Sequence, residues 1–144
     1  MKIKIINKSN NPLPSYESES SAGMDLKAFT SNDIIINPLQ RTIIKTGLFM
    51  SLPIGYEGQV RSRSGLSIKH GVCVLNSPGT IDSDYRGEIG VILINLSSDP
   101  FVISSGDRIA QLVISKHETI KWSVTETLED SKRGNKGFGS TGIN

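Results

Sequence analysis

Short apolar runs recur along the chain and are separated by Gly, Pro, Asn, Asp and Ser. The runs are rich in Ile and Val, which suit a pleated sheet. Many short strands with frequent turns are typical of a β-sandwich or barrel, so we expect an all-β fold. The pattern predicts strands over residues 2–6, 25–28, 33–36, 41–46, 48–52, 58–63, 72–75, 89–95, 101–103 and 108–115.

One short helix interrupts this pattern. It is predicted from Gly65 to about His70, with Ser64 as its N-cap and Gly71 as its C-terminal stop. No long amphipathic helix is visible, which argues against a doubly wound α/β fold.

The end of the chain differs from the rest. Residues 131–144 read SKRGNKGFGSTGIN, a glycine-rich stretch with little that could build a core. We therefore expect a β domain over residues 1–130, followed by a flexible arm over residues 131–144. Because the arm also carries Arg133 and Phe138, a cation and an aromatic, it could fold over a ligand.

Composition narrows the class of protein. The chain has 144 residues, which fits one domain. Its net charge of +2 is too small to indicate a nucleic-acid or membrane surface, so neither partner is expected. No run approaches the roughly 20 apolar residues of a membrane span, and the N-terminus does not read as a signal peptide. The single cysteine, Cys73, gives no support for secretion, and a cytoplasmic location is expected.

Residues 62–67, SRSGLS, form the first candidate site. If a helix begins after Ser64, its free backbone N–H groups favour an anion. Arg63 adds a forked guanidinium that suits phosphate, and Ser64 adds a hydroxyl. The alternative is a simple N-cap beside a solvated arginine.

Residues 79–88 place Asp82, Asp84 and Tyr85 in a turn between apolar runs. A carboxylate near a bound phosphate can act as general base on water. An acidic surface turn is the alternative. Elsewhere, Asp25 could hold a hydrated Mg²⁺, and Gln111 needs partners among its apolar neighbours, although both residues also suit purely structural roles.

Taken together, these segments resemble the five ordered motifs of the trimeric dUTPase family. The resembling segments are residues 22–28, 63–67, 79–87, 106–112 and 133–142. Each motif is weak alone, but five in the right order are highly specific. The resemblance implies a jelly-roll-like, distorted β-barrel subunit and a homotrimer with shared active sites. It also implies hydrolysis of dUTP to dUMP and pyrophosphate by water attack on the α-phosphorus. That reaction would limit uracil incorporation into DNA and supply dUMP for thymidylate synthesis.

The resemblance also assigns roles to residues. Asp82 would be the general base, and Asp25 would hold the cofactor Mg²⁺ through its water shell. Tyr85 would pack under the deoxyribose and leave no room for a 2′-hydroxyl, and Phe138 of the arm would stack on uracil. The substrate-binding residues that it implies are Arg63, Ser64, Gly65, Asn76, Ile81, Tyr85, Gln111, Arg133, Phe138, Gly139, Ser140 and Thr141.

Two positions depart from the family pattern. Ser62 stands where the family usually has proline, and we expect this change to loosen the loop entering the helix. Lys136 stands where a glycine is common, and it adds a cation near the expected phosphate position.

Two other functions compete with this interpretation. The first is a dCTP deaminase, which shares the fold and carries a catalytic Glu downstream of the third motif. Aligned on Asp82, that position falls on Ile92, which cannot transfer protons. The second is a catalytically inactive nucleotide-binding module on the same fold. It would be expected to lose the base or the arm, whereas Asp82 and the whole tail are present.

Overall fold

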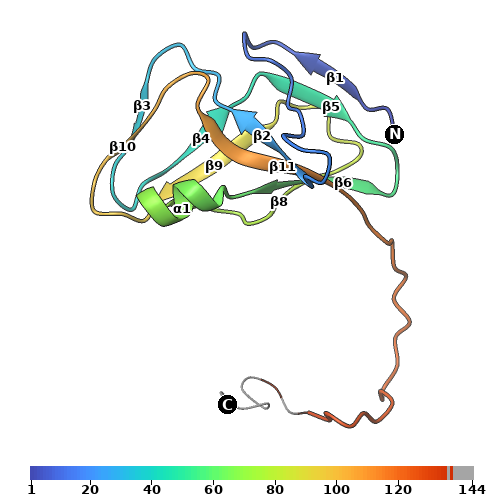
Figure 1. Cartoon of the computed structure of the whole chain (residues 1–144). Helices are drawn as coiled ribbons and strands as arrows, with labels where there is room; N and C mark the ends of the chain where they lie inside the picture. The colour runs from blue at the N-terminus through green and yellow to red at the C-terminus, as the bar shows by residue number, and fades with distance from the viewer. Residues whose placement is uncertain (136, 138–144) are drawn as a thin grey trace.

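The computed structural model describes residues 1–135 and residue 137, and it consists of β-strands with one short helix (Figure 1). The all-β prediction is confirmed. The elements are β1 (Lys4–Asn7), β2 (Gly23–Lys27), β3 (Ile34–Ile36), β4 (Arg41–Lys45), β5 (Leu48–Ser51), β6 (Tyr56–Arg61), α1 (Ser64–His70), β7 (Val72–Val74), β8 (Gly79–Ile81), β9 (Gly90–Asn95), β10 (Phe101–Ile103) and β11 (Arg108–Lys116).

The strands form four antiparallel sheets. Two sheets are pairs, β1-β5 and β10-β3, while the larger sheets have the orders β2-β11-β6-β8 and β4-β9-β7. Within the described part of the chain these sheets do not join into a closed barrel, so the distortion of the predicted barrel extends to open edges between the sheets. The strands are short, and closing a barrel would require continuous pairing around the whole circumference.

The core lies between the inward faces of these sheets. In β9, Val91 and Leu93 are fully buried, whereas Ile92 and Ile94 are partly exposed, which is the alternation of a strand with one face on the core. Part of the outward surface of this sheet is nevertheless apolar. Ile43 of β4 lies opposite Ile92 and is 61% exposed. Arg41 and Lys45 alternate with Ile43 along β4 and are exposed as well. The outer face of the sheet β4-β9-β7 therefore carries an apolar patch flanked by charged side chains.

The helix is close to its prediction but begins earlier. Its first residue is Ser64, and Arg63 is the N-cap, so the prediction of Ser64 as N-cap is wrong. The reason is the hydrogen bond from the Ser67 N–H to the Arg63 carbonyl, 3.0 Å long, which places the start of the helix at Arg63. Gly71 ends the helix as predicted, with a φ of 64° that suits glycine.

Strand β8 was not predicted, because Gly79–Ile81 reads as part of a turn. Pairing with β6 explains why this segment forms a strand. Thr80 lies opposite Gln59, and Ile81 lies opposite Gly58. Gly79 itself packs so tightly that an added Cβ would lie 3.0 Å from the Asn76 amide nitrogen.

Beyond β11 the chain leaves the β body and runs away from it as an extended segment (Figure 1). Large apolar side chains in this segment are exposed, among them Ile120 at 62%, Trp122 at 87% and Val124 at 98%. None of the helices in the described residues is long and apolar enough to cross a membrane.

Candidate functional site

A cluster of charge forms around Asp25 in β2. The Arg63 Nε atom donates to Asp25 Oδ1 at 3.2 Å, and the Arg108 Nη1 atom donates to Oδ2 at 3.2 Å. Gln111 lies directly opposite Asp25 on β11, and its amide donates to Oδ1 at 3.5 Å. The Asp25 side chain is only 10% exposed. Burial without these partners would be costly for a carboxylate, so the two guanidinium groups are integral to the cluster.

The start of helix α1 lies beside this cluster. Arg63 is both the N-cap and an Asp25 partner, and its Nη1 atom also donates to the Arg108 carbonyl at 2.9 Å. The N–H groups of Ser64 and Gly65 precede that of Ser67, which is the first to donate within the helix, so the helix itself does not satisfy them. Both residues are exposed, and the space beside Gly65 is open. The loop therefore presents donors and positive charge to one region of solvent.

This donor set suits a phosphate better than it suits a bare metal ion. Among the described residues, no group of three or more His, Cys, Asp or Glu side chains could hold a metal. Three donors already approach Asp25, and a carboxylate accepts about four hydrogen bonds. One position is left for a water molecule. The geometry thus fits a Mg²⁺ contact through water and leaves direct coordination to other ligands.

A second group of predicted residues follows β8. Tyr85 closes a turn by donating its N–H to the Asp82 carbonyl at 3.2 Å, and its hydroxyl donates to the Glu88 carbonyl at 3.1 Å. Asp82 is exposed, and Tyr85 is 46% exposed. Both line a small cavity of about 180 Å³. Ile81 is 8% exposed, so its side chain belongs to the core.

The strand registers separate these two groups. Asp25, Gln111 and Arg61 lie in one row across β2, β11 and β6. Ile81 of β8 lies opposite Gly58, toward the other end of β6. From Asp25 to Asp82 the path covers about 14 Å across three strand spacings and about 13 Å along the strands, or on the order of 20 Å in total. One chain therefore does not bring the predicted base to the predicted phosphate ligands.

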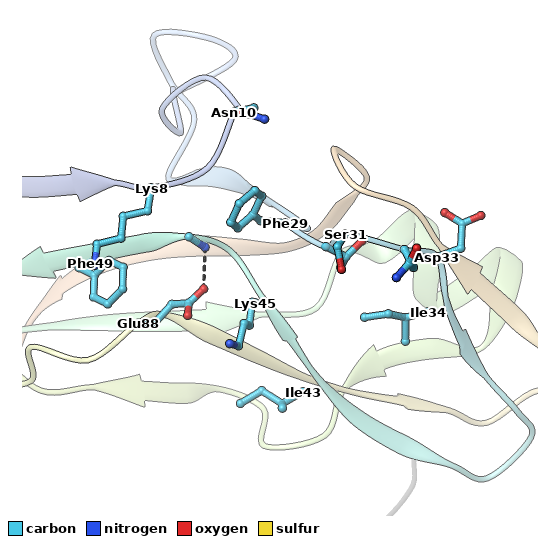
Figure 2. A pocket seen from close by; sticks show the side chains of 13 residues that line it. Lys8, Asn10, Phe29, Ser31, Asp33, Ile34, Ile43, Lys45, Phe49 and Glu88 are labelled. Carbon is cyan, nitrogen blue, oxygen red and sulfur yellow. Dashed lines mark hydrogen bonds between the residues drawn. The ribbon is translucent and has the colours of Figure 1, made fainter.

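A larger cavity lies elsewhere. It measures about 800 Å³, and none of the predicted site residues lines it (Figure 2). Its wall includes Lys8, whose Nζ atom is 4.8 Å from the centre of the Phe49 ring, and Glu88, which accepts a 2.8 Å hydrogen bond from the Gly47 N–H. Glu88 also lines the small cavity that contains Asp82. The two cavities are thus neighbours that share a wall.

Ser62 does not loosen its loop, contrary to expectation. Its hydroxyl accepts a 2.9 Å hydrogen bond from the Val74 N–H and lies 3.4 Å from the Ser77 hydroxyl. Ser77 in turn donates to the Val74 carbonyl at 2.6 Å. These contacts tie the loop before α1 to the loop that carries Asn76. A proline could not offer this acceptor, so the substitution replaces one kind of restraint with another.

The arm residues are only partly within the described structure. Arg133 is exposed in the segment that follows β11. The other predicted substrate-binding residues of the tail lie outside the described residues, and so does the departure Lys136. The positions concerned are Lys136, Phe138, Gly139, Ser140 and Thr141.

Sequence reasoning did not single out Arg108 and Glu88. Arg108 stands in the fourth resembling segment, but a register shift between Arg108 and Ala110 obscures which side chain it faces across the strands. A charged residue next to a β-bulge is a weak signal at best. Glu88 directly follows the third segment, and only the contact with Gly47 marks it as more than a surface carboxylate.

Comparisons with known proteins agree with the fold and the motifs. The family model described as dUTPase matches residues 9–142. A deoxyuridine 5'-triphosphate nucleotidohydrolase from Finegoldia magna is 56% identical over 142 residues, covering 99% of each chain. The same enzyme from Cytophaga hutchinsonii is 57% identical over 140 residues, covering 97% of this chain and 91% of the relative.

Solved structures give the same result. A mutant dUTPase of phage 80alpha has a TM-score of 0.86 at 28% identity. The match covers 96% of this chain and 98% of the phage chain. A second mutant of the Staphylococcus bacteriophage 80alpha dUTPase, in complex with dUpNHpp, has a TM-score of 0.84 at 27% identity, with 99% of each chain covered. The arrangement of strands is therefore that of these β proteins.

The Asp25 cluster makes a testable contribution to stability. Asp25→Asn removes the charge that both arginines share, and we expect the free energy of unfolding to fall by about 1–3 kcal/mol, as for hydrogen bonds to charged groups. Urea unfolding at one fixed protein concentration measures this change. Asp33→Asn, an exposed carboxylate of the same type, is the control and should change stability by no more than about 0.5 kcal/mol. Equal midpoints for the two variants would contradict a stabilising role for the cluster.

Proposed function

We infer that the chain hydrolyses dUTP to dUMP and pyrophosphate, because it belongs to the dUTPase family. The observation that carries this inference is the family match over residues 9–142, which takes in both groups of site residues. Relatives that are more than half identical in sequence bear the name of this activity. The reaction limits uracil incorporation into DNA and supplies dUMP for thymidylate synthesis.

Asp82 is the general base in this proposal. Its carboxylate is exposed at the end of β8, where it is accessible to a water molecule that attacks the α-phosphorus. The neighbouring turn, closed by the Tyr85 N–H on the Asp82 carbonyl, holds its backbone in place. Phosphoryl chemistry asks mainly for positioning and charge stabilisation, and a fixed carboxylate meets the first requirement.

The Asp25 side of the structure binds the triphosphate. Arg63 provides a guanidinium and shares Asp25 with Gln111, and the residues that follow it provide the Ser64 hydroxyl and the Gly65 backbone N–H. Arg108, 51% exposed, adds a second guanidinium to the same region. Asp25 would hold Mg²⁺ through water, because two arginines already share the carboxylate. The ion would supply positive charge beside the phosphates.

The β8 side recognises the nucleoside. Tyr85 forms a wall beside C2′ of the sugar and rejects ribose, and its half-exposed ring is available for this contact. Asn76 touches the nucleotide, and the backbone from Asn76 to Tyr85 reads the Watson–Crick edge of uracil. The binding of dUpNHpp by the phage 80alpha dUTPase supports a nucleotide ligand on this fold.

A homotrimer completes the site in this proposal. The separation of roughly 20 Å between Asp25 and Asp82 is too large for one triphosphate to span with both in contact, so a second copy must supply one group. The apolar patch on the outer face of β4-β9-β7, with Ile43 and Ile92, is a suitable surface for that copy. The exposed Trp122 of the segment after β11 also needs a partner surface.

The arm over residues 131–144 closes the shared site. Arg133 reaches the γ-phosphate, Phe138 stacks on uracil, and Gly139, Ser140 and Thr141 supply further phosphate donors. Closure excludes water and strengthens the charge contacts around the phosphates. The enzyme works in the cytoplasm, where its one free cysteine, Cys73, stays reduced.

The two competing functions are weaker. A dCTP deaminase needs a proton-transferring side chain where Ile92 stands on β9. An inactive binding module has no need of an exposed carboxylate in the position of Asp82. Neither alternative explains the combination of phosphate donors and a candidate base.

A panel of nucleotides tests the proposed activity. With Mg²⁺, the protein should release pyrophosphate from dUTP and far less from UTP, dTTP or dCTP. The 2′-hydroxyl, the C5 methyl and the C4 amino group should each clash or mispair. No release from dUTP would overturn the assignment, and ammonia released from dCTP would indicate the deaminase.

Replacing Asp82 separates binding from chemistry. Asp82→Asn should bind dUpNHpp about as well as the unaltered protein but hydrolyse dUTP at least about 100-fold more slowly, since it removes only the general base. Calorimetry measures the binding, and single-turnover kinetics measures the rate. Asp84→Asn, in the same turn, should keep most of the activity. An Asp82→Asn variant with normal turnover would exclude Asp82 as the base.

Mixing two inactive variants tests whether sites are shared between chains. Asp82→Asn lacks the base, and Arg63→Met lacks a phosphate ligand. If trimers re-form at random from an equal mixture, about a quarter of the sites should combine an intact Arg63 with an intact Asp82 from different chains. The mixture should then regain a comparable fraction of activity. A mixture as inactive as its components would contradict a shared site.

A further inference from the structure

We propose that Gly87 and Glu88 are positioning residues that set sugar specificity by fixing the ring of Tyr85. The inference rests on the proposed function, in which this ring is the wall beside C2′. Both residues lie in the candidate segment 79–88, but the sequence assigned no role to either of them. Three features of the structure support the proposal: a close contact, a backbone acceptor and an anchored segment.

The close contact is between Gly87 and the Tyr85 ring. A Cβ atom added at Gly87 would overlap the Tyr85 Oη and Cζ atoms and would lie 2.9 Å from Cε2. Real Cβ atoms essentially never approach a neighbour this closely, so any side chain at position 87 displaces the ring. Gly87 is therefore required for its lack of a side chain, because only glycine lets the ring fold back over the main chain.

The backbone acceptor is the Glu88 carbonyl, which receives the Tyr85 hydroxyl at 3.1 Å. This bond and the close approach of Gly87 both act at the hydroxyl end of the ring. The hydrogen bond directs the hydroxyl to the Glu88 carbonyl, and the absence of a side chain at Gly87 leaves room for the hydroxyl and the adjoining ring atoms. Rotation of the ring away from its position breaks the first restraint.

The segment that holds the ring is itself anchored to the core. The Glu88 carboxylate accepts the Gly47 N–H at 2.8 Å, as the dashed line in Figure 2 shows. The Ile89 N–H donates to the Leu48 carbonyl at 2.8 Å. Thr46, which is 1% exposed, donates its hydroxyl to the Ile89 carbonyl at 2.6 Å. Bonds from three consecutive residues thus fix residues 88 and 89 against β5 and the turn before it.

Anchoring matters because the Tyr85 ring can exclude a 2′-hydroxyl sterically only if the ring itself does not move. The ribose of UTP differs from deoxyribose by one hydroxyl, and a movable ring would simply shift to admit it. A ring held by Gly87 and Glu88 must instead lose a hydrogen bond and disturb a packed segment. The discrimination against UTP is then set by how firmly residues 87–89 are held, as well as by the ring itself.

The test compares kcat/KM for dUTP and for UTP in the trimeric protein. Gly87→Ala should lower the ratio of these two values by about tenfold or more, the range associated with small steric differences in a pocket. A merely structural role would lower both values together and leave the ratio unchanged. An unchanged ratio in Gly87→Ala would overturn the proposal.

A double variant shows whether Gly87 acts through Tyr85. In the Tyr85→Ala background the wall is absent, so adding Gly87→Ala should leave the dUTP to UTP ratio as it is in Tyr85→Ala alone. A further fall in that background would contradict the mechanism. Failure of the proposed function is distinguishable, since it appears as no dUTP hydrolysis by the unaltered protein.

Substitutions of Glu88 test the proposal in a second way, which can be used if the Gly87→Ala variant does not fold. Glu88→Gln retains an oxygen that accepts from the Gly47 N–H and should keep the ratio, whereas Glu88→Ala removes the anchor and should lower it. Lys45→Gln, which changes a charge in the wall of the same cavity without touching the anchor, is the control. Equal ratios in Glu88→Ala and Lys45→Gln would exclude the anchoring role of Glu88.

Discussion

The register of the sheet β2-β11-β6-β8 is the constraint on which the rest of the structure depends. Backbone hydrogen bonds place Asp25 and Gln111 in one row across the sheet. They also pair β8 with β6 in a register that puts Asp82, after the end of β8, far from that row. Strand spacings are nearly invariant, so no side-chain rotation brings the two groups together. The proposed shared site therefore requires a second copy of the chain, and the apolar patch on the outer face of β4-β9-β7 is the surface proposed for that contact.

The two halves of the site are held in place by different forces. Around Asp25 the restraint is electrostatic, since one mostly buried carboxylate pairs with Arg63 and Arg108. Around Tyr85 the restraint is packing and neutral hydrogen bonds, through Gly87 and the Glu88 carbonyl. Charge suits a site that must bind phosphates, whereas a rigid neutral wall suits a site that must measure the shape of a sugar.

The departures from the sequence-based expectations come from hydrogen bonds that residue preference does not encode. The helix starts at Ser64 because the Arg63 carbonyl accepts from Ser67, which is a matter of backbone geometry. Ser62 restrains its loop because the Val74 N–H happens to lie within 2.9 Å of its hydroxyl. Strand β8 exists because β6 is available as a partner. In each case a contact between segments distant in sequence, or a local hydrogen bond, outweighed residue preference.

The sequence by itself determined the all-β class, nearly every strand and the identity of the chemical groups, because alternating apolar positions and ordered motifs are local properties of the chain. Only the tertiary structure decided how those groups are used. It showed that Asp25 is committed to two arginines, that Asp82 lies far from it, and that Gly87 and Glu88 hold the ring of Tyr85. The physical reason is that hydrogen-bond partners and strand registers join residues far apart in the chain, and residue spacing does not encode them.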